Sequence, residues 1–249
     1  MAAMECASPR RFRALLIAVA LGVSAFLATP AMAQGNDFDD CARLSGDAAT
    51  NACTRAIDSG RYRDHQLAQL YYNRGVEFND RDQLERAIQD YSQAIGIDPR
   101  YASAYYNRGL AYRKLGKVDQ AIADYTVAIE IRPSAEFYNN RGVAFEKKGD
   151  NQRALSDYNE AIRLRPDYAI AFYNRANIRS DQNQTQEALT DYNEAIRLNP
   201  KYTNAHFNRG LLYKRQGNRE RAIADFRRVL ELSPNDSGAR KNLQDLGAN

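Results

Sequence analysis

The chain has 249 residues, including 35 Lys or Arg, 31 Asp or Glu and three Cys, and its formal net charge at pH 7 is +4. Three of the Arg and one of the Glu lie in residues 1–33, so the charge of the remainder is nearly balanced. This balance does not favour nucleic-acid binding, which requires a concentrated basic face. The sequence has no Gly-rich phosphate loop, Ser-His-Asp set or metal-ligand cluster, and we expect no enzymatic activity, no cofactor and no metal site.

The first 33 residues have the organisation of a secretory signal peptide. Three arginines precede an apolar run over residues 14–28, and the triplet Ala31-Met32-Ala33 provides a small-residue cleavage site. We therefore expect cleavage after Ala33 and export from the cytoplasm. The alternative is a membrane anchor, although an apolar run of this length is shorter than the roughly 20 residues of a spanning helix.

Residues 34–67 are predicted to form an N-terminal capping hairpin that contains two cysteines. Cys41 and Cys53 remain once signal cleavage has removed Cys6. Two thiols in one small element of an exported protein are expected to form a disulfide. The alternative is a pair of buried free thiols. A metal site is not expected here, because two cysteines without a nearby histidine make an incomplete ligand set.

From residue 68 onward the sequence repeats with a period of 33 or 34 residues. The motif Tyr-Tyr-Asn-Arg-Gly at 71–75 returns at 105–109, and related versions occur at 138–142, 172–176 and 206–210. A period of this length indicates stacked supersecondary units.

Each unit is predicted to contain a helix, a tight turn and a second helix. In the second unit, Tyr105, Gly109 and Tyr112 follow helical spacing until Gly116 interrupts it. Helical spacing then resumes and ends at Pro133. Because Gly109 has no side chain, the two helices of the unit can approach closely at that point.

This pattern resembles the tetratricopeptide repeat family over about residues 68–234. The resemblance implies an all-α, right-handed superhelical solenoid of antiparallel helix pairs. The expected repeats are 68–101, 102–134, 135–168, 169–202 and 203–235, followed by a capping helix in 236–249.

The fourth repeat departs from the pattern at Ala176, Arg179 and Asn183. We expect Asn183 to preserve the turn, because Asn tolerates the left-handed backbone conformation. Arg179 does not suit an aromatic core position, so we expect this repeat to be the loosest.

Two charged positions recur in every repeat. The arginine of each motif is Arg74, Arg108, Arg141, Arg175 or Arg209. The aspartate before each second-helix aromatic residue is Asp90, Asp124, Asp157, Asp191 or Asp225. We expect ion pairs between packed helices at these positions, which fix register more reliably than they add stability.

The other motif positions predict a binding groove. The resemblance places the first helices on the concave side of the solenoid, with the asparagines and the aromatics before them facing the groove. The expected groove residues are Tyr72, Asn73, Tyr106, Asn107, Asn140, Tyr173, Asn174, Phe207, Asn208, Arg113, Lys114 and Lys147. An Asn amide both donates and accepts hydrogen bonds, so a row of asparagines can hold an extended peptide backbone about every third residue. The alternative is that the asparagines bond within the scaffold.

By similarity to exported tetratricopeptide repeat proteins of Gram-negative bacteria, we expect a non-enzymatic scaffold of the cell envelope. The resemblance favours the periplasm as its location, with secretion as the second choice. The expected partner is a protein or an extended peptide, and no stable membrane span is expected after signal cleavage. The alternative function is a self-associating structural subunit whose groove is buried in an oligomer.

Overall fold

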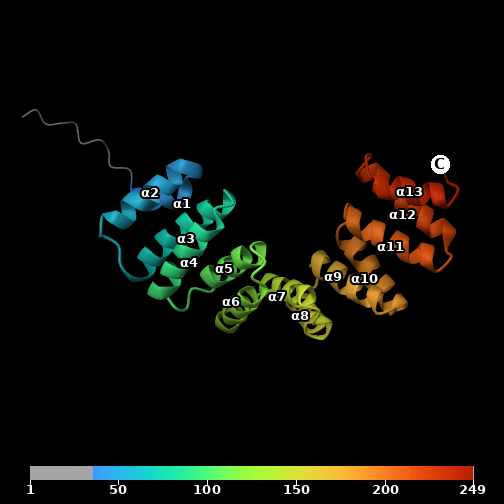
Figure 1. The fold of residues 1–249 in the computed structure, drawn as a ribbon, viewed down its shortest axis with the longest axis horizontal. Helices are drawn as coiled ribbons and strands as arrows, with labels where there is room; N and C mark the ends of the chain where they lie inside the picture. Colours follow the sequence, from blue (N-terminus) through green and yellow to red (C-terminus); the bar gives the residue numbers. More distant parts are fainter. Residues whose placement is uncertain (1–35, 249) are drawn as a thin grey trace, which may run out of the picture. The chain divides into compact units, whose positions relative to one another are not determined.

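The computed structural model describes residues 36–248, and the predicted signal segment lies outside them. The described residues form thirteen α-helices and no strand, which confirms the all-α repeat fold (Figure 1). None of these helices is both long enough and apolar enough to cross a bilayer. In chain order the helices are α1 (Asp37–Arg43), α2 (Gly46–Asp58), α3 (Asp64–Asp80), α4 (Leu84–Ile97), α5 (Ala102–Lys114), α6 (Val118–Ile131), α7 (Ala135–Lys147), α8 (Asn151–Leu164), α9 (Ala169–Asp181), α10 (Thr185–Leu198), α11 (Thr203–Arg215), α12 (Arg219–Leu232) and α13 (Ser237–Asp245).

Each helix packs mainly on its neighbours in the chain. The pairs α3–α4, α5–α6, α7–α8, α9–α10 and α11–α12 are the five repeats, and the second helix of each repeat also packs on the first helix of the next (Figure 1). Helix α3 begins at Asp64, four residues before the predicted start of the first repeat. The N-terminal hairpin α1–α2 is therefore shorter than predicted.

One residue with left-handed backbone geometry lies in the turn of each repeat. These residues are Asp82, Gly116, Gly149, Asn183 and Gly217. The φ angle of Asn183 is 60°, which confirms that Asn replaces Gly in the fourth turn. A short polar side chain is tolerated in this region of backbone space, where most side chains are not.

A glycine of the first helix faces a tyrosine ring of the second helix, and this contact sets the distance between the two helices of a repeat. A Cβ atom added to Gly109 would lie 2.7 Å from the Tyr125 ring, which is too close for any real contact. Tyr125 itself is fully buried. Gly75 and Gly142 are opposed by Tyr91 and Tyr158 in the same way. The small first-helix residue is thus needed because the second helix contributes a tyrosine.

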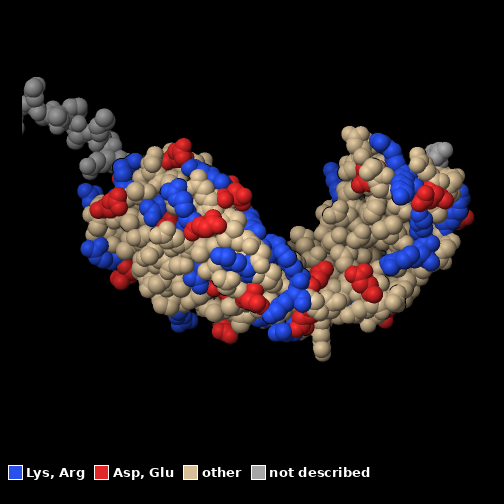
Figure 2. Space-filling model, viewed as in Figure 1, with Lys and Arg blue, Asp and Glu red and all other residues tan. Residues whose placement is uncertain are grey.

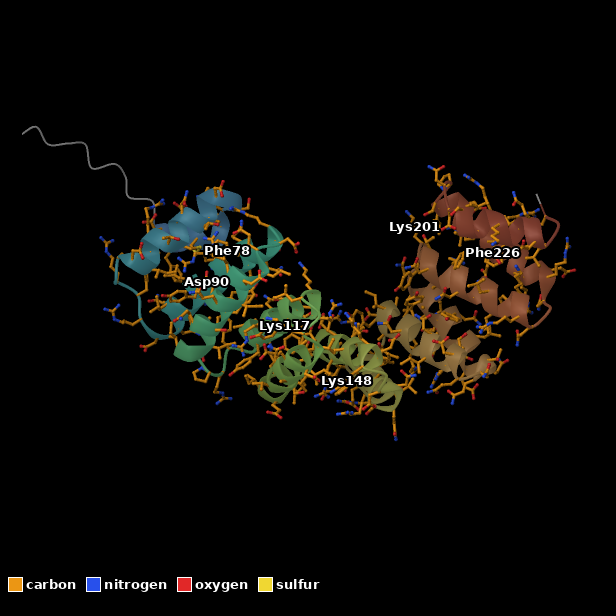
Figure 3. All side chains as sticks on the ribbon, viewed as in Figure 1. Phe78, Asp90, Lys117, Lys148, Lys201 and Phe226 are labelled. Carbon is orange, nitrogen blue, oxygen red and sulfur yellow. A yellow bond between two sulfur atoms is a disulfide. The ribbon has the colours of Figure 1, made fainter. Side chains whose placement is uncertain are left out.

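The five motif arginines each connect three helices. Arg108 on α5 donates from Nε and Nη2 to the two oxygens of Asp124 on α6, both at 2.8 Å. Its Nη1 donates to Ser92 on α4, the second helix of the preceding repeat, at 2.9 Å. The predicted ion pairs are confirmed in all five repeats, and Asp90 of the first one is labelled in Figure 3. The contacts to the preceding helix in the other repeats fall on Thr54, Thr126, Asn159 and Asn193.

Arg179 is held in the fourth repeat by an ion pair. Its Nη1 donates to Asp191 Oδ2 at 2.7 Å, and the same carboxylate also pairs with Arg175. An ion pair thus occupies the position where the other repeats carry an aromatic ring. The looseness expected of this repeat stays a prediction.

Polar helices close both ends of the stack. At the N-terminal end, the structure joins Cys41 of α1 to Cys53 of α2 by a disulfide, and both residues are buried. At the other end, Asp236 caps α13 by accepting from the Ala239 N–H at 2.7 Å. Helix α13 packs on α12.

Candidate binding groove

Aromatic rings of the first helices form the floor of the candidate groove. Tyr72 of α3 and Tyr106 of α5 are half-buried. Each packs on the buried tyrosine of its own second helix, with ring centroids 5.9 Å apart for Tyr72 and Tyr91 and 5.8 Å apart for Tyr106 and Tyr125. In the fifth repeat, Phe207 packs on Phe226, which is labelled in Figure 3. These predicted groove residues are therefore also part of the packing between helices.

The motif asparagines link each repeat to the one before it. Asn107 Nδ2 donates to the Tyr72 hydroxyl at 2.8 Å, and Asn140 Nδ2 donates to the Tyr106 hydroxyl at 2.9 Å. Asn208 and Tyr173 are joined in the same way at 3.1 Å. We call this series the Asn–Tyr ladder. It joins residues 34 or 35 positions apart, so neighbouring repeats share it.

The ladder restricts what the asparagines can offer a partner. Asn140 also donates to the Glu136 carbonyl, and Asn208 also donates to Asn177 Oδ1, so both hydrogens of these two amides have internal acceptors. For Asn140 and Asn208, the group left to bind a partner is therefore the amide oxygen.

The third repeat breaks the ladder. Asn139, which is almost fully buried, replaces the aromatic residue and accepts from Asn174 at 3.0 Å. This repeat begins after the 33-residue spacing, and it lacks the tyrosine that packs on the ladder elsewhere, as Tyr202 packs on Tyr173. Phe137 fills that place by stacking on Tyr106 with centroids 4.5 Å apart.

The groove tyrosines are neutral hydrogen-bonding groups at neutral pH. Burial raises the pKa of Tyr106 to about 12, and the hydrogen bond from Asn140 opposes this only in part. Burial likewise raises the pKa of Tyr72. Their hydroxyls are thus not charged partners for a ligand.

A hollow of about 820 Å³ lies on the first helices of the C-terminal half. It is lined by Glu146, Asn177, Ser180, Asp181, Tyr192, Asn208, Leu211, Lys214, Arg215 and Asn242. Amides and hydroxyls outnumber apolar side chains among these residues, so the hollow suits a polar chain such as a peptide backbone better than an apolar ligand. A second hollow of about 620 Å³ surrounds Tyr106 and Phe137.

The cations of the C-terminal hollow already have partners within the chain. Lys214 Nζ donates to Asn242 at 2.8 Å and to Asp245 at 2.9 Å, and Arg215 donates to Ser180. Two of the three cations predicted for the groove, Lys114 and Lys147, are exposed. Figure 2 shows acidic side chains scattered over the face that it draws and a run of adjoining Lys and Arg side chains near its middle.

Some residues that line the C-terminal hollow were not predicted from the sequence. They lie outside the repeated five-residue motif. Asn177 and Ser180 follow the motif of the fourth repeat by one and four positions, and Asn242 lies in the capping helix α13. The available signal was the repeat alignment itself. The position four residues after the motif holds Asn79, Arg113, Glu146, Ser180 and Lys214, so it changes character in every copy.

The described residues contain no group of three or more His, Cys, Asp or Glu arranged to hold a metal ion. His206 is buried between Asp225 and the Pro200 carbonyl, each 3.2 Å from a ring nitrogen. It is a packing residue in this position and does not face the groove hollows.

Comparison with known families gives a consistent result. Tetratricopeptide repeat profiles match residues 75–116 and 176–217, 106–169, 157–190 and 203–236. Together these matches run without a break from 75 to 236. No curated protein matches the chain in a sequence search.

Solved structures of repeat proteins share the fold. YrrB, described as a TPR protein with an unusual peptide-binding site, has 22% identity and a TM-score of 0.63, and the match covers 79% of this chain and 100% of YrrB. A structure of MamA has 25% identity and a TM-score of 0.60, with 64% and 94% covered. A tetratricopeptide repeat protein from Parabacteroides merdae has 23% identity and a TM-score of 0.64, with 73% and 72% covered.

Proposed function

Because the chain belongs to the tetratricopeptide repeat family, a family of protein-interaction scaffolds, we propose that it is a non-enzymatic scaffold that binds a partner protein or an extended peptide along its first helices. The observation that carries this proposal is the 820 Å³ hollow, in which amide and hydroxyl groups from α9, α10, α11 and α13 come together. The description of YrrB as a peptide-binding repeat protein supports the same use of the fold.

The geometry favours a partner bound in extended form. First helices of neighbouring repeats pack about 10 Å apart, which equals about three residues of extended chain. The motif asparagines repeat at this interval, since one lies on each first helix of the five repeats. An extended backbone N–H group can therefore meet one Asn oxygen per repeat.

Site-specific photo-cross-linking tests the proposal. A photoreactive residue is placed at Leu211 in the C-terminal hollow and, as the matched control, at Thr190 on the exposed side of α10. We expect a discrete adduct with a different protein from position 211 and none from position 190. Adducts formed only with a second copy of the chain would instead support the self-associating subunit.

We further propose that the scaffold works in the periplasm after removal of residues 1–33. The signal-like sequence of that segment supports this, as does the pair of cysteines in the N-terminal hairpin. N-terminal sequencing of the chain from a fractionated Gram-negative host tests it. A start at Gln34 in the periplasmic fraction is expected, and a chain that keeps residues 1–33 in the membrane fraction contradicts it.

A further inference from the structure

The buried tyrosines of the second helices direct their hydroxyls to the groove side of the repeat. Tyr158 Oη donates to Glu146 Oε2 at 2.7 Å, and Tyr192 Oη donates to Asn177 Oδ1 at 2.7 Å. Glu146, Asn177 and Tyr192 all line the C-terminal hollow. The third and fourth repeats thus supply an acceptor of their own for this hydroxyl.

The second repeat does not supply one. The residue in the position of Glu146 is Arg113, a guanidinium that cannot accept a hydrogen bond. Accordingly, the Tyr125 hydroxyl hydrogen has no acceptor in the interior of the repeat, and neither has the buried Nε–H of Arg113. Buried donors without acceptors are uncommon in native proteins and cost stability.

Both groups are donors at neutral pH. Burial raises the pKa of Tyr125 to about 12, and Arg113 acts in the opposite direction without overcoming burial. Arg113 and Tyr106 both lie on α5, and the Arg113 charge acts to lower the pKa of Tyr106. The exposed ammonium of Lys114 follows in sequence. What this cluster lacks is an anionic acceptor.

We propose that Arg113 and Tyr125 form an oxyanion site that takes a carboxylate of the segment bound in the groove. The inference rests on the proposed function and specifies its partner, which carries an Asp or Glu side chain where it crosses the second repeat. Arg113 is half-buried and Tyr125 is fully buried, so the proposal requires the Arg113 side chain to turn aside when the carboxylate binds. Glu146, one repeat further along, repels a second carboxylate and so fixes the position of the first.

The test uses the full chain immobilised and offered libraries of capped nine-residue peptides, randomised except for a central Glu, Gln or Lys. A fourth library carries the central Gln and a free C-terminal carboxylate. We expect the Glu library to be retained about tenfold better than the Gln library, the ratio given by one charge-assisted hydrogen bond. Equal retention of both overturns the oxyanion site and leaves the proposed function standing. Retention of none of the four overturns the proposed function as well.

Matched variants identify the site. Tyr125→Phe and Arg113→Gln should both abolish the preference for Glu, while Tyr158→Phe, which removes a hydroxyl already paired to Glu146, should keep it. A preference that survives Tyr125→Phe contradicts the assignment. Better retention of the fourth library than of the Glu library shows that the carboxylate comes from a chain terminus, which overturns the side-chain source proposed here.

Arg113→Glu separates binding from folding. It recreates the arrangement of the third repeat, in which a carboxylate accepts from the tyrosine hydroxyl. We expect a higher melting temperature together with loss of the Glu preference. A lower melting temperature with unchanged preference would show that Arg113 is only a structural residue.

Discussion

A motif arginine joins three helices through three hydrogen bonds, and this makes it the residue on which each repeat most depends. Arg108→Ala leaves the buried Asp124 carboxylate without its partner, so we expect a loss of about 3 kcal/mol in the free energy of unfolding. Arg108→Lys should recover little, because a single ammonium cannot replace a bidentate fork. Urea titration measures both. The control Arg163→Ala removes an exposed pair within one helix and should leave the midpoint unchanged.

The Asn–Tyr ladder allows scaffold and binding roles to be separated at single residues. Asn107→Ala and Tyr72→Phe remove the same hydrogen bond from its two ends, and each should lower stability by about 1 kcal/mol. Only Asn107→Ala also removes the amide oxygen. If that oxygen contacts the partner, calorimetry well below the melting temperature should show weaker binding for Asn107→Ala alone. Equal affinities for the two variants would assign Asn107 to the scaffold.

Equivalent aspartates respond differently to their surroundings. Burial acts to raise the pKa of Asp225, but hydrogen bonds from Arg209 and His206 together outweigh it and hold this pKa below its ordinary value. At Asp157, desolvation dominates over the hydrogen bond from Arg141 and the charges of Arg141 and Arg153, and it raises the pKa. The extra donor in the fifth repeat accounts for the difference.

A carboxyl group whose pKa is lowered in the folded state stabilises the fold at pH values above its ordinary pKa of about 4. This stabilisation is lost as the pH falls through the lowered pKa. Carboxyl-carbon NMR titration should therefore find Asp225 titrating below Asp157. His206→Phe restores the aromatic type found elsewhere at this position and should move the Asp225 midpoint upward. An unchanged midpoint would show that His206 does not act on this carboxylate.

At the scale of the element, the N-terminal hairpin depends on its cysteines more than the repeats depend on any one bond. Cys41 and Cys53 close a short loop, so the disulfide contributes about 3 kcal/mol at most. Cys53→Ser should speed amide exchange mainly over residues 37–63, because stability in a stack is nearly a sum of neighbour contributions. Uniformly faster exchange through α12 would contradict this local role. In the unaltered chain, alkylation without reductant should label neither cysteine.

The helix pairs and their ion pairs were predictable because both signals recur at a fixed spacing. Every motif arginine lies 16 residues before its aspartate, so the pairing could be predicted without coordinates. The Asn–Tyr ladder could not, since hydrogen-bond partners in different repeats leave no local pattern. The ion pair of Arg179 could not be predicted for a related reason, because the sequence does not show that the Asp191 carboxylate, already paired with Arg175, also reaches this position.

At the scale of the whole molecule, the described ends and surface favour a chain that does not stack on itself. Helix α2 exposes Asp47, Asn51 and Arg55, and α13 exposes Arg240 and Lys241. Polar terminal helices of this kind block end-to-end addition of further repeats. The large hydrophobic residues exposed among those described are Leu164 and Ile170, which together make at most a small apolar patch.

Sedimentation velocity over a hundredfold range of concentration tests this directly. We expect one sedimentation coefficient throughout, with the mass of a single chain. A coefficient that rises with concentration would favour the self-associating subunit, and the substitutions Leu164→Ser and Ile170→Ser would then show whether these two side chains form the contact.

Each motif arginine donates to the second helix of the preceding repeat, and this contact allows whole repeats to be duplicated during evolution. A duplicated repeat brings an arginine for the unit before it and a Ser, Thr or Asn for the unit after it, so both new junctions are satisfied at once. Gene duplication can therefore lengthen the groove by whole repeats, and each longer chain has these arginine contacts at every new junction. The third repeat is the exception, because Phe137 and Asn139 are matched to Tyr106 and Asn174 on either side. The third repeat therefore fits only at its own position in the stack, whereas the other repeats can be exchanged with one another.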